Sequence, residues 1–189
     1  MDSGKRNARS KWYQGSEFPN HRQSDLISKR SERSLDVAPG GTLSDYVPFY
    51  FTPYSIMMLN IITGRNVQKV PCEEIVIFVS SLSRIAAEGI PFVFTNQHAF
   101  ALNAEYFTDL DDLDRIDWPL LQSRDFKHDP DDPEKKERYQ AEALIWRHIP
   151  IGAFRGICCY TEPVAEELRA EVQMRGLSLQ VAAQRSWYF

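Results

Sequence analysis

An acidic segment at positions 107–137 constrains the fold of this chain more than any other part of its sequence. The segment contains prolines, many aspartates and little strand pattern, and a connection of about 30 residues is unusual inside a compact domain. Long connections of this kind commonly carry function or move. We therefore expect the strands and main helices to lie before and after it, and we expect the segment itself to serve a function.

Short strands and helices follow one another irregularly on both sides of that segment. Strands are predicted at residues 46–51, 75–79, 91–95, 139–149, 156–160 and 177–181, with 187–189 joining the last as an edge strand. Helices are predicted near 24–31 and at 56–61, 85–87, 97–106 and 164–172. This order lacks the regular alternation of a doubly wound sheet and indicates an α+β or mixed α/β domain.

Three of these strands carry two expectations about their position in the sheet. The run at 75–79 is continuously apolar, which suits a central strand buried on both faces. The strands at 139–149 and 156–160 can pair through the turn around 150–152. The first expectation concerns the burial of one strand, and the second concerns the pairing of two strands that are joined by a tight turn.

Composition limits the class of protein. A chain of 189 residues that is 43% hydrophobic suits a single domain. No apolar run approaches the roughly 20 residues of a membrane span, and no signal-peptide core follows the basic start, so we expect a cytoplasmic protein. Three cysteines, two of them adjacent at Cys158 and Cys159, fit neither a disulfide framework nor a zinc site, and no metal is expected.

The charge distribution leaves two interpretations open. A formal net charge of -4 argues against a protein that coats nucleic acid by charge alone. Basic residues concentrate before position 35, whereas aspartates crowd the segment 109–132. The two regions form either faces of opposite sign or a solvated basic tail and a solvated acidic loop.

Glu142 stands out among the residues that could carry chemistry. The chain has no glycine-rich phosphate loop, nucleophile elbow or His-Glu-x-x-His motif. Glu142 lies among apolar neighbours in the stretch 139–146, where a partly desolvated carboxylate suits a general base or the stabilisation of a developing cation. The alternative, which the pattern alone favours, is a carboxylate on the solvated face of a half-buried strand, paired with Arg138 or Arg147.

Five blocks of sequence carry a family resemblance. Three follow one another at 40–53 (GGTLSDYVPFYFTP), 91–95 (PFVFT) and 138–142 (RYQAE). The other two are Asp117-Trp118-Pro119 and the closing Trp187-Tyr188-Phe189. In order and spacing the chain resembles the DarT family of DNA ADP-ribosyltransferase toxins from about residue 20 to its end.

The resemblance implies an ADP-ribosyltransferase fold, an α+β domain whose central split sheet, mixed or antiparallel, has flanking helices and holds NAD. It implies one domain over residues 1–189. Within it, the basic segment 1–35 would cover NAD, and 101–142 would form a substrate-recognition loop that ends at the catalytic glutamate. The long acidic connection would then serve in substrate recognition.

Two residues match the catalytic pair of the family. Glu142 corresponds to its catalytic glutamate, and Arg30 to the arginine of the segment that folds over NAD. Alone, Arg30 would be taken for a solvated surface residue. Cleavage of the bond between nicotinamide and ribose develops positive charge on the sugar, which a carboxylate stabilises. A guanidinium is suited to grip the NAD phosphates or the DNA.

Several aromatic and basic side chains are candidates for contact with DNA. An unpaired base can stack on an aromatic ring. The candidates are Tyr46, Tyr50, Tyr54 and His98, with Lys29 beside Arg30. For a single aromatic residue the alternative is packing in the core.

The start of the chain departs from the family pattern. DarT proteins begin with a segment of the His-x-x-x-Asn-Leu type that contributes to the NAD pocket, and residues 1–20 contain no match to it. We therefore expect the catalytic pair to be present and part of the NAD site to be missing.

The expected activity is transfer of ADP-ribose from NAD to a base in single-stranded DNA, with release of nicotinamide. Thymine is the favoured base and guanine remains open. The resemblance implies a toxin that a macrodomain antitoxin counteracts, with a role in phage defence. Two alternatives are a non-enzymatic single-stranded nucleic-acid-binding module and an enzyme that ADP-ribosylates RNA or protein.

Overall fold

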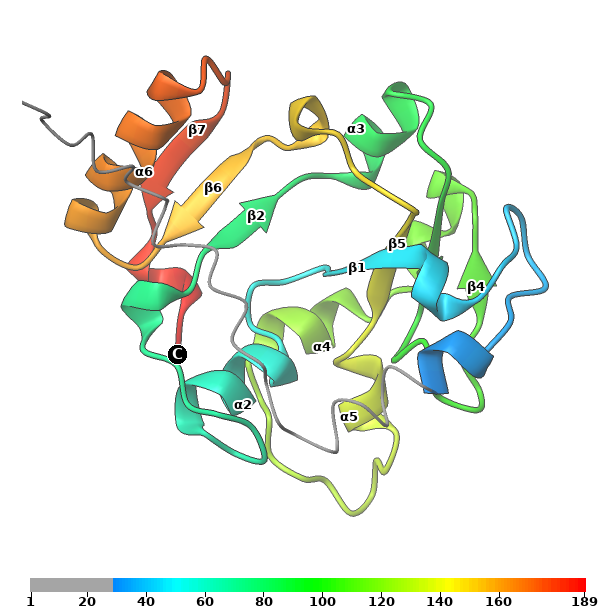
Figure 1. Ribbon diagram of the computed structural model, residues 1–189. Coiled ribbons are helices and arrows are strands. Elements are labelled where there is room, and N and C mark those ends of the chain that lie inside the picture. The colour runs from blue at the N-terminus through cyan, green and yellow to red at the C-terminus, as the bar shows by residue number, and fades with distance from the viewer. Residues whose placement is uncertain (1–28) are drawn as a thin grey trace, which may run out of the picture.

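The computed structural model describes residues 29–189 and contains two separate sheets (Figure 1). The first sheet has the order β1-β5-β3-β4, formed by Tyr46–Tyr50, Glu142–Trp146, Phe92–Thr95 and Tyr106–Phe107, and all its pairs are antiparallel. The second has the order β2-β6-β7, formed by Ile77–Val79, Gly156–Cys159 and Gln180–Ala183. In it, β2 and β6 are antiparallel while β6 and β7 are parallel. The expected split, mixed sheet of an α+β domain is confirmed.

Five helices flank the sheets: α2 (Ile56–Thr63), α3 (Leu82–Ala87), α4 (Trp118–Ser123), α5 (Lys135–Arg138) and α6 (Glu162–Met174). Short 3-10 helices are present at Leu43–Asp45, Cys72–Glu74, Leu110–Arg115, Ile151–Ala153 and Arg185–Trp187. The side chain of Ser55 caps the start of α2, and Gly64, with a φ of 76°, ends it in the left-handed conformation that glycine adopts without strain. Most of the predicted helix near 24–31 lies outside the described residues. Residues 29–32, which are described, are helical.

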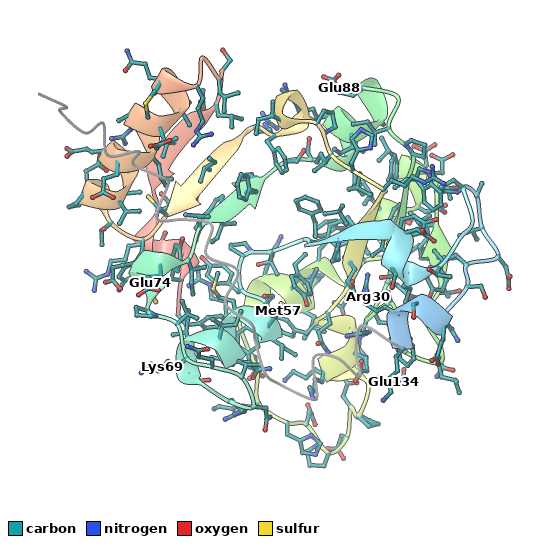
Figure 2. The ribbon with its side chains drawn as sticks, in the orientation of Figure 1. Arg30, Met57, Lys69, Glu74, Glu88 and Glu134 are labelled. Atoms are coloured by element: carbon teal, nitrogen blue, oxygen red, sulfur yellow. The ribbon has the colours of Figure 1, made fainter. Side chains whose placement is uncertain are left out.

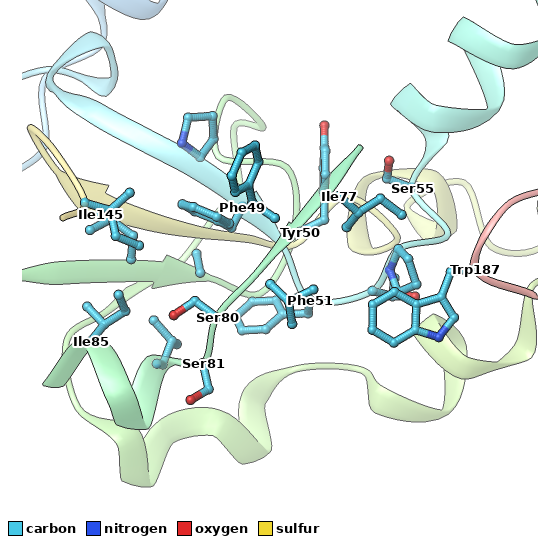
Figure 3. A pocket seen from close by; sticks show the side chains of 18 of the residues that line it. Phe49, Tyr50, Phe51, Ser55, Ile77, Ser80, Ser81, Ile85, Ile145 and Trp187 are labelled. Atoms are coloured by element: carbon cyan, nitrogen blue, oxygen red, sulfur yellow. The ribbon is translucent and has the colours of Figure 1, made fainter. Parts of the chain in front are cut away.

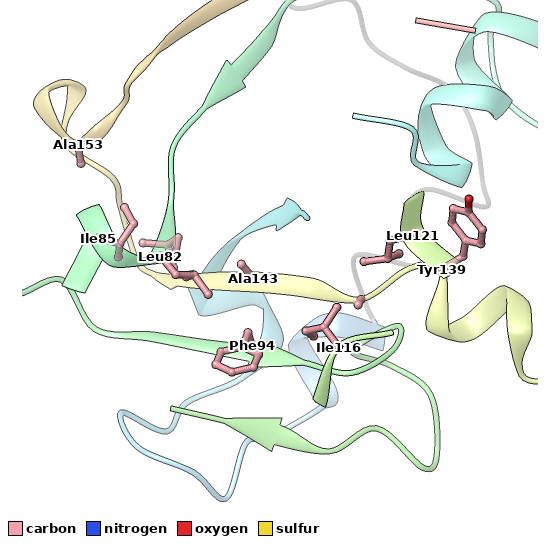
Figure 4. Packing of buried hydrophobic residues seen from close by; sticks show 10 residues of the cluster. Leu82, Ile85, Phe94, Ile116, Leu121, Tyr139, Ala143 and Ala153 are labelled. Atoms are coloured by element: carbon pink, nitrogen blue, oxygen red, sulfur yellow. The ribbon is translucent and has the colours of Figure 1, made fainter. Parts of the chain in front are cut away.

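The strand β5 is buried on both of its faces. Ala143 and Ile145 point into one hydrophobic cluster together with Phe94 (Figure 4). Leu144 points to the opposite face, into a second cluster that includes Val93. Successive side chains of a strand alternate between faces, so the two clusters lie on opposite sides of the four-stranded sheet. Because both faces of β5 are packed against buried side chains, its first residue, Glu142, is held in a fixed position.

The structure corrects the prediction of a helix at 97–106. Residues 96–105 form turns, and Tyr106 begins β4 instead. The side-chain amide of Asn96 donates to the Glu105 carboxylate at 2.7 Å, and its side-chain oxygen accepts from the Glu105 backbone N–H at 3.1 Å. One bond between side chains and one from backbone to side chain therefore join the two ends of this loop, and no helix forms in it.

The predicted pairing of the strands was also wrong in two places. The strand β2 is an edge strand with Phe78 44% exposed, not a central strand buried on both faces. The strand β5 pairs with β1 and β3, whereas β6 belongs to the other sheet. Arg147, directly after β5, has a φ of 58°, which turns the chain away before a hairpin forms. At the end of the chain, Trp187 lies in a 3-10 helix, and β7 is the closing strand.

The acidic segment 107–137 is folded onto the first sheet. Arg138 connects two positions within it, because its guanidinium donates to both oxygens of Asp132 at 3.0 and 2.7 Å and to Asp117 at 3.1 Å. Asp117 also caps α4 by accepting from the backbone of Leu120. A forked guanidinium holds two carboxylates in a fixed geometry, so the segment is anchored immediately before the start of β5.

Candidate active site

Glu142 is the first residue of β5 and is 3% exposed. Its backbone N–H donates to the hydroxyl of Thr95 on β3 at 3.1 Å. Thr95 is fully buried, and its hydroxyl donates in turn to the carbonyl of Gln97 at 2.6 Å. Two neighbouring strands therefore fix the backbone from which the carboxylate projects.

The carboxylate of Glu142 has partners on both oxygens. Oε2 lies 3.4 Å from Nη1 of Arg30, and Oε1 accepts from the backbone N–H of Ala99 at 3.1 Å. Arg30 also donates from Nη2 to the carbonyl of Leu43 at 3.2 Å. Figure 2 shows Arg30 near β1 and β5, whereas Lys69, Glu74 and Glu88 lie towards the edge of the molecule in this view. The burial of this carboxylate is compensated by an ion pair and hydrogen bonds.

This arrangement differs from the solvated alternative considered for Glu142. Arg138 is bound to Asp117 and Asp132, and the guanidinium of Arg147 lies over the ring of Trp146 at 5.0 Å. Neither arginine is the partner of Glu142. The residue that is paired with it, Arg30, comes from a position 112 residues earlier in the chain.

Tyr50 lies directly opposite Glu142 in the pairing of β1 with β5. Burial raises the pKa of the Tyr50 hydroxyl, and the negative charge of Glu142 raises it further, while Arg30 opposes the shift. Tyr50 therefore remains a neutral phenol that can donate a hydrogen bond next to the carboxylate.

His98 completes the group around Glu142. Its Nδ1 lies 3.8 Å from Oε1 of Glu142 and accepts from the backbone N–H of Phe100 at 3.0 Å. The backbone N–H of His98 donates to the carbonyl of Glu137, just before the catalytic strand. The histidine is thus held from both sides by backbone contacts.

The remaining expected DNA contacts, Lys29, Tyr46 and Tyr54, differ in exposure and in the groups that they contact. Lys29 is exposed and adjacent to Arg30. Tyr46 is 5% exposed, its hydroxyl donates to the carbonyl of Gly40, and its ring packs edge-on against Trp146. The ring of Tyr54 carries the Arg124 guanidinium 3.4 Å from its centroid. The rings of Tyr46 and Tyr54 are thus engaged in packing against other side chains of the protein.

The structure adds residues to the site that the motif search did not single out. Thr95, Ala99 and Tyr106 form hydrogen bonds around Glu142, and Tyr106 donates from its hydroxyl to the Ala99 carbonyl. Only Thr95 has a signal in the sequence, as a polar residue at the end of an apolar strand inside one of the five blocks. Ala99 acts through its backbone, which no side-chain motif reveals.

A cavity of about 630 Å³ lies on the other face of the first sheet (Figure 3). Its walls come from β1 and β5, from β2 and α3, and from Trp118 and Trp187. The β5 residues that reach it are Ala143 and Ile145, which alternate with Glu142 and Leu144. The cavity is mainly apolar and is bounded by the edge strands of both sheets.

The part of the chain that the structure describes, residues 29–189, contains no group of three or more His, Cys, Asp or Glu side chains placed to hold a metal ion. None of its helices is long and apolar enough to cross a membrane. Its three cysteines, Cys72, Cys158 and Cys159, are not in disulfides.

The split sheet with a buried glutamate at the start of a central strand defines an ADP-ribosyltransferase fold, and comparison with solved structures agrees. Thermus sp. 2.9 DarT in complex with ADP-ribosylated ssDNA superposes with a TM-score of 0.80 at 32% identity, over 88% of this chain and 79% of that chain. The same protein in complex with NAD+ gives a TM-score of 0.78, over 85% of this chain and 81% of that chain.

Sequence comparison gives the family. The family model described as ssDNA thymidine ADP-ribosyltransferase, DarT, matches residues 3–189. A DNA ADP-ribosyl transferase from Escherichia coli is 53% identical over 166 residues, which are 87% of this chain and 76% of the relative. One from Thermus sp. is 32% identical over 87% of this chain and 78% of the relative. The chain belongs to the DarT family.

Proposed function

We propose that this chain transfers ADP-ribose from NAD to thymine in single-stranded DNA and releases nicotinamide. The single observation that carries the proposal is the buried pair of Glu142 and Arg30 at the start of β5. Family membership and the NAD+ and ADP-ribosylated ssDNA complexes of Thermus DarT support the choice of both substrates.

The residues around Glu142 suit this chemistry. As the bond between nicotinamide and ribose breaks, the sugar becomes positively charged, and the adjacent carboxylate stabilises it. Thymine in DNA has one ring N–H, so that nitrogen must lose its proton as it bonds to the sugar. Glu142 is the group that we assign to receive this proton, and Arg30 is assigned to the NAD phosphates or the DNA backbone.

Among the expected DNA contacts, we retain Tyr50, His98 and Lys29. Tyr50 and His98 adjoin Glu142, and Lys29 adds exposed positive charge next to Arg30. We also retain the recognition loop 101–142, which Arg138 anchors before Glu142, and the segment 1–35 as the part that covers NAD. Recognition would then take place at one end of the four-stranded sheet.

In the cell, we propose that the protein is a toxin acting in the cytoplasm, where NAD and replicating DNA are present. A macrodomain antitoxin that removes the modification would be its partner, and defence against phage is the expected context. Growth arrest on expression, relieved by co-expression of an ADP-ribose-removing macrodomain, tests this part.

The direct test is to incubate a thymidine-containing single-stranded oligonucleotide with NAD and measure its mass. The chain should add one ADP-ribosyl group, and Glu142→Gln, which preserves shape, should lower the rate by at least about 10³-fold. Glu167→Gln, on the exposed face of α6, is the matched control and should retain the wild-type rate.

Other outcomes would select a different function. Oligonucleotide binding with strong salt dependence and no NAD consumption would indicate a binding module. Labelling of RNA or protein in preference to DNA would keep the enzyme class and change the acceptor. Full activity of Glu142→Gln would remove Glu142 from the mechanism.

A further inference from the structure

Two successive peptide groups, between residues 98 and 100, connect the residues of the site. The N–H of Ala99 belongs to the first peptide group and donates to Oε1 of Glu142 at 3.1 Å. The N–H of Phe100 belongs to the second and donates to Nδ1 of His98 at 3.0 Å. The carbonyl of that second group accepts from the hydroxyl of Tyr106. One peptide group is therefore held on one side by Tyr106 and on the other by His98.

Tyr106 is well placed to act as a fixed point. It is the first residue of β4 and pairs with Thr95, the residue whose hydroxyl binds the backbone of Glu142. Its ring packs against the second hydrophobic cluster, which also contains Ala99. The hydroxyl thus reaches the 98–100 backbone from a strand that is already tied to the catalytic strand through β3.

Peptide groups are planar, so the two groups that flank Ala99 can move relative to each other only by rotation about the bonds of its α-carbon. If the second group rotates, its N–H leaves His98. If it stays fixed, the first group can turn away from Glu142 only about the N–Cα bond of Ala99. Holding the Ala99 carbonyl therefore fixes the contact with His98 and restricts the motion of the Ala99 amide.

The contact with Phe100 also determines the form of His98. Because Nδ1 accepts a backbone N–H, a neutral imidazole carries its proton on Nε2. His98 then offers a hydrogen-bond donor, through Nε2, to an acceptor such as a base carbonyl or a phosphate.

We propose that Tyr106 is a positioning residue for the transfer reaction: through the Ala99 carbonyl, its hydroxyl holds the amide that binds Glu142 and the amide that orients His98. The inference rests on the proposed function for its catalytic consequence. Its structural consequence, an ordered Ala99 amide and a single tautomer of His98, can be measured without activity.

The test compares Tyr106→Phe with Tyr188→Phe. Both variants remove one hydroxyl that donates to a backbone carbonyl, but the Tyr188 hydroxyl binds Ile75 and Cys158, beside the second sheet. In Tyr106→Phe we expect kcat to fall about 10-fold while KM for NAD and for oligonucleotide stays within about 2-fold, as for a misplaced catalytic group. Tyr188→Phe should retain the wild-type kcat.

A second measurement reads the same effect without catalysis. By NMR, the Ala99 amide should exchange its hydrogen about 10-fold faster in Tyr106→Phe than in the wild type, and the His98 nitrogens should lose the signature of a single Nε2–H tautomer. Tyr188→Phe should leave both signals unchanged.

The outcomes separate the two proposals. Wild-type kcat, Ala99 exchange and His98 tautomer in Tyr106→Phe would overturn the positioning role, as would an equal loss of kcat in both variants. If the wild-type chain modifies no DNA yet Tyr106→Phe alone loosens the Ala99 amide and His98, the proposed function fails and the structural part of the inference stands.

Discussion

The two faces of strand β5 differ at its beginning. Glu142 points to one face, where Arg30 forms an ion pair with it and the Ala99 backbone N–H donates to it, while Tyr50 lies opposite it on β1. One residue later, Ala143 points to the other face, which is apolar and borders the cavity. The two faces of β5 therefore have different tasks. The first holds a buried charge in place for chemistry, and the second supplies apolar burial that keeps the strand in position.

The first face is polar only at this one end. Two residues after Glu142, Leu144 returns to the same face and is fully buried in the second hydrophobic cluster. A buried carboxylate is costly unless it is paired, so its partners must be supplied by segments that the strand itself does not contain. They come from residue 30 and from the turn after β3.

After Glu142→Gln, the largest effect is expected on the polar face, from Arg30→Met. This variant leaves Glu142 without its cationic partner and removes the group assigned to NAD or DNA, so the rate of DNA modification should fall about 10² to 10³-fold. Arg175→Met, which removes an exposed arginine at the end of α6, should have the wild-type rate. An Arg30→Met enzyme with wild-type activity would contradict the assignment of chemistry to this face.

A smaller effect, of another kind, is expected on the apolar face. Ile145 is 2% exposed, and Ile145→Ala should lower the free energy of unfolding by about 3 kcal/mol, measured by urea denaturation. Because Ile145 does not touch Glu142 or Arg30, the folded fraction should retain its kcat. A variant that unfolds like the wild type but loses kcat would show that the two faces do not divide their tasks in this way.

The residues of the Glu142–Arg30 pair could be singled out from the sequence, because both lie in register with recognisable blocks, and the structure brings them together. The turn at 96–105 could not, since the apolar residues Ala99, Leu102 and Tyr106 have helical spacing while the Asn96 and Glu105 contacts close a turn. Strand partners could not be predicted either. The apolar residues of β5 indicate that it is buried but do not identify its neighbours, and the chain turns away after β5 at Arg147, whose φ is positive.

The smallest effect is expected off both faces, at the Arg138 contact that anchors the acidic segment. The hydrogen bond from Arg138 lowers the pKa of the Asp132 carboxyl below its ordinary 3.8, and desolvation only partly opposes this. A lowered pKa in the folded state stabilises the fold above pH 3.8, and that stabilisation is lost as pH falls below this value. Asp132→Asn should therefore lower Tm slightly at pH 7, and the difference from wild type should narrow towards pH 3. Thermal unfolding of both proteins at the two pH values measures it. A gap in Tm of the same size at both pH values would mean that Asp132 contributes through packing instead of charge. The acidic segment would then be anchored mainly by its other contacts, such as the ion pair of Lys135 with Asp125.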